Sequence, residues 1–154
     1  MNWLTDLVTN PFLITGMSSW LLAQIIKIII NAVLHKQVRF GMLFADGGMP
    51  SGHSATVTSL ALICALRCGF GTFEFAIAAI LAIIVCNDAA GVRQETGKQA
   101  VLLNEIIKAF DDLGKDGLPE VKLKEFVGHT PIQVAAGVTL GLANALLMHF
   151  VVFA

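Results

Sequence analysis

Long apolar runs dominate the pattern of hydrophobic and polar positions along the chain. Four of them approach the roughly 20 apolar residues that a membrane-spanning helix needs. They cover residues 12–34, 54–70, 72–90 and 131–154. Because lipid offers no partner to a free backbone N–H or C=O, each run should be helical. The runs are apolar on all sides, which disfavours the alternative of a soluble bundle with an apolar core. The pattern predicts an all-α membrane bundle of about four transmembrane helices, with residues 1–154 as a single domain.

Two segments break this apolar pattern. In the first run, Gln24, Lys27 and Asn31 lie three and four residues apart, so they share one helix face. A lysine inside a span usually faces a bundle interior or a water-filled site; snorkelling of Lys27 to the interface is the alternative.

The long polar segment 91–130 contains apolar residues on one side of 100–110. That periodicity predicts an amphipathic helix at the membrane surface.

The distribution of positive charge predicts the orientation. Four spans place both termini on one side and segments 35–53 and 91–130 on the other. The second side holds eight cations: Lys36, Arg39, Arg93, Lys98, Lys108, Lys115, Lys122 and Lys124. The first side holds Arg67 alone. Because cytoplasmic loops carry the excess of Lys and Arg, segments 35–53 and 91–130 should be cytoplasmic.

The fourth run carries Gly137, Gly141 and Ala145 at intervals of four residues. Small residues at that spacing let two helices approach closely. The partner is either another helix of the same chain or a second copy, so a homo-oligomer formed through this run is one of two interpretations.

Composition narrows the range of partners. Of the 154 residues, 56% are hydrophobic and 14% are charged, against about 25% charged in soluble domains. The net charge is −1, tyrosine is absent and only two tryptophans occur. Stacking platforms for nucleic acids combine basic grooves with aromatic side chains. We therefore expect membrane lipids, and no nucleic acid, as partners.

Candidate chemistry begins at Pro50-Ser51-Gly52-His53, just before the second run. Ser51 can cap the following helix, and Gly52 lets a ligand approach the backbone. First-turn N–H groups and the helix dipole favour an anion there. His53 can exchange a proton with a phosphate oxygen. A plain cap and turn with an interfacial histidine is the structural alternative.

Two further groups are predicted at the same membrane level. His129 precedes Thr130 and Pro131, a plausible cap and first residue of the fourth helix. Two histidines at helix starts suit phosphoryl transfer, in which one attacks phosphorus and the other protonates the leaving oxygen. At the end of the third run, Asp88 either orients a histidine or pairs with Arg93 or Lys27; a bridge to Arg93 would hold helix ends.

Taken in order, the segments 39–54, 88–93 and 128–131 resemble the divergent branch of the type 2 phosphatidic acid phosphatase superfamily, which also includes vanadium haloperoxidases. The central motif is Pro50-Ser51-Gly52-His53. The branch consists of small bacterial and plant membrane proteins, and the resemblance covers almost the whole chain. It implies a metal-independent helical phosphatase without a cofactor, here in a bacterial plasma membrane.

The resemblance also assigns roles to residues. Lys27 and Arg39 match the first motif at a longer spacing, and Ser51, Gly52 and His53 match the second, with His53 as general acid. His129 matches the nucleophile. The arginine that normally precedes it is absent, and Arg93 and Lys98 are the candidates to replace it. The aspartate expected four residues after the nucleophile is Gln133. Asp88 is the preferred candidate to support His129 in its place, and Glu125 is the alternative.

Together these features predict a membrane phosphatase or pyrophosphatase that hydrolyses a lipid-linked phosphate through a phosphohistidine at His129. A non-catalytic binder or carrier of lipid phosphates is the alternative, and Gln133 is the residue that most favours it. A haloperoxidase is disfavoured, because that resemblance is to soluble enzymes.

Overall fold

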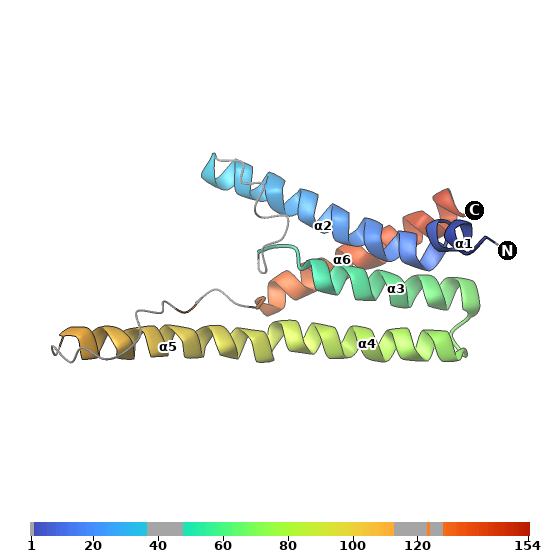
Figure 1. The fold of residues 1–154 in the computed structure, drawn as a ribbon. Coiled ribbons are helices and arrows are strands. Elements are labelled where there is room, and N and C mark those ends of the chain that lie inside the picture. The colour runs from blue at the N-terminus through green and yellow to red at the C-terminus, as the bar shows by residue number, and fades with distance from the viewer. Residues whose placement is uncertain (1, 37–47, 113–122, 124–127) are drawn as a thin grey trace.

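The computed structural model describes residues 2–36, 48–112, 123 and 128–154 of the chain. Every regular element in this described part is helical (Figure 1). The elements are α1 (Trp3–Val8), α2 (Pro11–His35), α3 (Gly52–Cys68), α4 (Phe73–Ala90), α5 (Val92–Asp112), α6 (Pro131–Leu147) and a closing π-helical turn, η2 (Met148–Val152). The prediction of an all-α fold is confirmed.

The helices begin where the sequence supplies caps. The Asn10 side chain accepts hydrogen bonds from the N–H groups of Phe12 and Leu13 at 2.9 and 3.2 Å, and Pro11 opens α2. The Thr72 hydroxyl accepts from the Phe75 N–H and starts α4. These side chains satisfy backbone donors that have no acceptor inside the helix, which fixes the entry of each helix.

Helix α3 is the centre of the bundle, because α2, α4 and α6 all pack against it. The contact with α6 is the tightest. A Cβ added at Gly137 would collide with the Ser51 carbonyl, and one at Gly141 with the Ala55 carbonyl and the Thr58 hydroxyl. Gly137 and Gly141 of the small-residue stripe therefore pack on α3 of the same chain, and a homo-oligomer formed through this run stays a prediction.

Three helical segments of the described residues are long and apolar enough to cross a membrane: Pro11–Leu34, Phe73–Phe110 and Pro131–Val152. Helix α3, with 17 residues, lies at the short end of the range for a span. The prediction of about four spans thus corresponds to three long helices and one short central helix.

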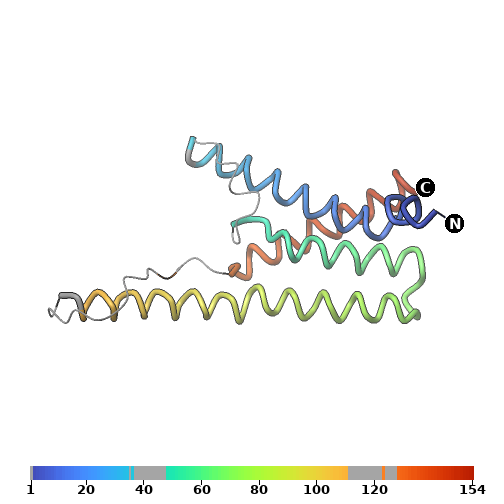
Figure 2. The backbone as a smooth tube through the Cα atoms, viewed as in Figure 1, coloured from blue at the N-terminus to red at the C-terminus, as the bar shows by residue number. Residues whose placement is uncertain are grey.

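The segment Phe73–Phe110 is longer than any membrane requires. Helices α4 and α5 follow one another almost in line, and Phe73–Phe110 comprises 38 residues (Figure 2). At about 1.5 Å per residue that is roughly 57 Å, against a hydrocarbon core of about 30 Å. The predicted amphipathic helix exists as part of α5, but it continues the direction of α4 beyond the bundle.

One end of the bundle holds both termini and the turn between α3 and α4 (Figure 1). The other end holds the C-terminal part of α2, the start of α3, the junction of α4 with α5 and the start of α6. This is the arrangement that the order of apolar runs predicts. It brings the three segments with candidate chemistry to one end.

A buried polar cluster joins three helices in the half of the bundle nearer the termini. The Asn144 amide nitrogen of α6 donates to the hydroxyls of Ser18 and Ser19 at 2.9 and 2.7 Å. It also lies 3.3 Å from the Thr15 carbonyl oxygen, which the Ser59 hydroxyl of α3 reaches at 3.5 Å. We call Thr15, Ser18, Ser19, Ser59 and Asn144 the Asn144 cluster. Such bonds hold helices together where lipid provides no alternative partner.

Candidate functional site

Two histidines meet at the end of the bundle opposite the termini. The ring centroids of His53, in the first turn of α3, and His129, just before α6, lie 6.2 Å apart. His129 is buried, with 4% of its surface exposed, whereas His53 is exposed. A ligand can therefore reach the pair from the side of His53. The separation leaves room for one phosphorus atom in contact with both rings.

The position of His129 is fixed by the junction of α4 and α5. Its backbone N–H donates to the Ala89 carbonyl at 2.9 Å. Gly128 has a φ of +86°, and a Cβ there would lie 2.6 Å from backbone atoms of Arg93 and Gln94. Only glycine combines that backbone conformation with so close an approach. The chain thus enters α6 pressed against the junction, with His129 held beside α3.

Ser51 joins the starts of α3 and α6. Its N–H donates to the Gln133 carbonyl at 3.0 Å, and its hydroxyl accepts from the N–H and the hydroxyl of Ser54 at 3.3 and 3.0 Å. The Ser51 N–H is therefore already used within the protein. The first-turn N–H groups of Gly52 and His53 have no acceptor inside α3 and are the backbone donors left for an anion.

Gln133 determines which ring nitrogen of His129 carries the proton. The Gln133 Oε1 accepts a hydrogen bond from the Thr130 N–H at 3.1 Å, which orients the amide, and lies 3.3 Å from His129 Nδ1. Because a carbonyl oxygen only accepts, this contact requires the proton on Nδ1. The neutral ring then carries its lone pair on Nε2, as a nucleophilic histidine must.

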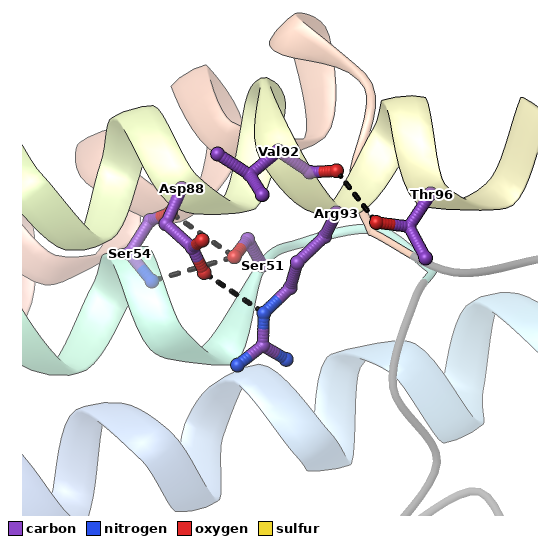
Figure 3. Close-up of polar contacts among 6 residues, drawn as sticks. All are labelled: Ser51, Ser54, Asp88, Val92, Arg93 and Thr96. Carbon is purple, nitrogen blue, oxygen red and sulfur yellow. Dashed lines mark hydrogen bonds and ion pairs between the residues drawn. The ribbon is translucent and has the colours of Figure 1, made fainter. Parts of the chain in front are cut away.

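An ion pair lies beside the first turn of α3. Arg93 Nε donates to Asp88 Oδ2 at 2.9 Å, and each side chain is 43% exposed. Figure 3 shows both residues near Ser51 and Ser54, with the two terminal guanidinium nitrogens turned away from Asp88. Arg93 can therefore use those nitrogens for a ligand while Asp88 holds Nε. The support of His129 by Asp88 stays a prediction, because the described contact of Asp88 is with Arg93.

Comparison with known proteins identifies the family of the chain. Residues 8–144 match the divergent PAP2 family. The chain belongs to that family. It is 35% identical to the uncharacterized membrane protein YuiD of Bacillus subtilis, over 94% of this chain and 98% of that protein. No solved structure matches the chain.

The remaining residues of the PAP2-like motifs differ in where they lie relative to the histidine pair. Lys27 is 4% exposed, so it faces the bundle interior instead of snorkelling, and its aliphatic chain lies against Gly48. Lys98 lies exposed on α5 in an ion pair with Glu95 at 2.6 Å. The contacts in the described part of the chain do not bring Lys98 to the histidine pair. Arg39 lies outside the described residues.

One polar residue near this PAP2-like site was not among the predicted site residues. The Gln24 side chain is 94% buried, and its Nε2 would lie 3.6 Å from a Cβ added at Gly52. The sequence signal was its place three residues before Lys27 on the same face of α2. That spacing showed that Gln24 and Lys27 share a face of α2. It did not show that this face packs against the start of α3.

Proposed function

We propose that this protein is a membrane phosphatase or pyrophosphatase that removes phosphate from a lipid-linked substrate. The observation that carries the proposal is the approach of His53 and His129 at 6.2 Å between ring centroids, each at the start of a helix. Helix starts attract anions, and phosphoryl transfer through a histidine needs a second group to protonate the leaving oxygen.

In the proposed reaction, the lone pair of His129 Nε2 attacks phosphorus and the bond from phosphorus to the leaving oxygen breaks. His53, protonated, gives its proton to that oxygen. Water then attacks the phosphohistidine, His53 accepts the proton of the water, and the P–N bond breaks to release phosphate. The Arg93 guanidinium, the Lys27 ammonium and the first-turn N–H groups of α3 stabilise charge on the three equatorial oxygens.

The position of the site favours an amphiphilic substrate. Helix α6 begins at the site and belongs to a segment long and apolar enough to cross a membrane, so we expect the site to open at the level of the lipid headgroups. A substrate anchored in the bilayer brings its phosphate to this level without leaving the membrane. Three apolar helices around the site should also exclude water from its inner side, which strengthens each charge interaction.

The decisive experiment is phosphate release by the purified protein from a panel of lipid phosphates and lipid pyrophosphates, with a metal chelator present. We expect release from at least one lipid, undiminished by the chelator. Release that stops with the chelator would contradict the metal-independent mechanism. Absence of release from every lipid, with binding retained, would favour the second candidate function.

That second candidate is a non-catalytic binder or carrier of lipid phosphates. It is favoured by the contact of His129 with Gln133, since a neutral amide fixes the tautomer of the ring but adds no charge to stabilise the imidazolium. The binder would use the same helix starts and cations, and differs only in that no P–O bond breaks.

We further propose that the protein lies in the plasma membrane with the site on the cytoplasmic face. The support is the excess of cations on that side of the sequence. Lys108 is exposed on α5, beyond the bundle. Lys108→Cys, in a chain whose native Cys64, Cys68 and Cys86 are replaced, should resist an impermeant thiol reagent in intact cells and react after permeabilisation. Ready labelling in intact cells would reverse the orientation.

A further inference from the structure

Gln24 has an oxygen that lacks a hydrogen-bond donor in the described part of the chain. Its Oε1 is buried without a partner, in a side chain that is only 6% exposed. A buried polar atom left unsatisfied costs about 1–3 kcal/mol, and lipid cannot supply the missing donor. Among the described residues this buried acceptor stays open, and a donor on a bound ligand can satisfy it.

The place of this oxygen indicates what the partner is. The Gln24 Nε2, which is bonded to the same carbon as this oxygen, would lie 3.6 Å from a Cβ added at Gly52, the first residue of α3. The first-turn N–H groups of Gly52 and His53 are the donors that we assign to the phosphate. Lys27 lies one turn further along the same face of α2. The open acceptor and the donors for an anion thus belong to one site.

An acceptor within an anion site creates a chemical requirement. A fully deprotonated anion offers only acceptor oxygens, so it would place one of them against Gln24 Oε1 with no proton between them. An anion that carries an O–H can donate that hydrogen to Oε1 while its other oxygens accept from N–H groups. The site is therefore complementary to a tetrahedral anion that retains one proton.

We propose that Gln24 is a ligand-binding residue that selects a phosphate group bearing a P–OH, by accepting a hydrogen bond from that hydroxyl. The inference rests on the proposed phosphate site and narrows its substrate class. Phosphate monoesters and terminal phosphates of pyrophosphates can carry the required proton. Phosphodiesters, which have no P–OH near neutral pH, lack it and should be poor ligands.

Inorganic phosphate and sulfate distinguish this role from general anion binding. The two ions have nearly the same shape, but at neutral pH phosphate keeps at least one P–OH and sulfate has none. Affinity for each is measured by titration calorimetry on the purified chain in detergent, at fixed ionic strength because salt screens both. We expect the wild-type protein to bind phosphate more tightly than sulfate.

Substitution of Gln24 should remove that preference. Gln24→Met keeps the length of the side chain without an acceptor, so phosphate affinity should fall roughly 5- to 100-fold while sulfate affinity stays equal or rises. Gln24→Glu keeps an acceptor but adds negative charge, so both anions should bind more weakly with phosphate still preferred. Ser19→Ala, a buried polar substitution elsewhere on α2, is the control and should leave both affinities unchanged.

The outcomes separate this inference from the proposed function. Equal losses of phosphate and sulfate affinity in Gln24→Met, or no loss of either, would overturn the selective role of Gln24 and leave the phosphate site standing. A wild-type protein that binds neither anion would overturn the phosphate site itself. Retained preference in Gln24→Glu, with a melting temperature like that of wild type, excludes misfolding as the cause.

Discussion

Two buried polar regions of this bundle share the same three helices but differ in how their hydrogen bonds are satisfied. In the Asn144 cluster, the amide nitrogen finds acceptors on Ser18 and Ser19 within 2.9 Å. At the other end, Gln24 keeps a buried oxygen without a donor in the described residues, and His53 is exposed beside His129. A membrane bundle can use buried polar groups either to hold helices together or to receive a ligand.

The two regions differ in whether every buried polar atom has a hydrogen-bond partner among the described residues. Since an unsatisfied polar atom in an apolar surrounding costs far more than a satisfied one gains, a complete cluster needs nothing from outside. An incomplete cluster is stabilised when a ligand supplies the missing partner. The comparison predicts that substitutions at the histidine end change ligand binding and turnover, whereas those in the Asn144 cluster change stability.

The largest effect is expected from His129→Ala. If Nε2 of this ring is the nucleophile, no phosphohistidine can form and phosphate release should fall to background. The ring is buried and contacts Gln133, so the melting temperature should also fall, and release is compared at a temperature at which both proteins stay folded. The measurements are phosphate release and thermal unfolding in detergent. Unchanged release would refute the assignment of the nucleophile.

His53→Ala should have the next largest effect. The ring is exposed at the start of α3 and, in the proposed reaction, gives its proton to the leaving oxygen. Its loss should slow release by roughly 10²- to 10⁴-fold, the usual contribution of a general acid. The rate is measured with a good and a poor leaving group. A loss as large for the good leaving group as for the poor one would argue against the acid role.

The sequence predicted much of this fold because each helix boundary has a local cause. Ser51 before Gly52 and Thr130 before Pro131 mark helix starts by capping and proline preference. The predicted run 54–70 began two residues late, because the apolar pattern begins only after the cap and the first turn. Helix α1 was not predicted, since six residues are too few to reveal a period.

The continuation of α4 into α5 was also not foreseen. Gly91 and the polar residues after it predicted the end of a helix. In the structure, α5 begins directly after Gly91, at Val92. The sequence predicted which segments of the chain meet at the site, because helices that cross the same membrane end at the same level. Pairings such as Arg93 with Asp88 depend on side-chain distances that spacing alone does not contain.

Gln133→Glu tests whether the neutral amide limits turnover. The glutamate has the same length, so it can accept from Thr130 and His129 as Gln133 does, and negative charge suits the first turn of α6. It would stabilise the imidazolium formed on attack. We expect turnover to rise by about tenfold, a fraction of the ~10⁴-fold that a carboxylate supplies in a serine protease triad.

Two results would change the interpretation of Gln133. Lower turnover in Gln133→Glu, with structure intact, would mean that another carboxylate already supports His129 and that the added charge opposes it; Asp88 is the candidate. Measurable turnover in Gln133→Glu from an inactive wild-type protein would support the binder alternative for the natural chain.

The smallest effect is expected from Asn144→Ala, and it should appear in stability alone. The substitution removes the amide that joins α6 to the two serines of α2, while the glycine contacts of α6 with α3 remain. Hydrogen bonds between membrane helices contribute on average about 0.6 kcal/mol and at most about 1.7 kcal/mol. The free energy of unfolding in mixed micelles should fall within that range, with phosphate affinity and turnover unchanged. Loss of phosphate affinity in Asn144→Ala, with a free energy of unfolding like that of wild type, would contradict the comparison of the two regions. It would mean that the Asn144 cluster also takes part in binding.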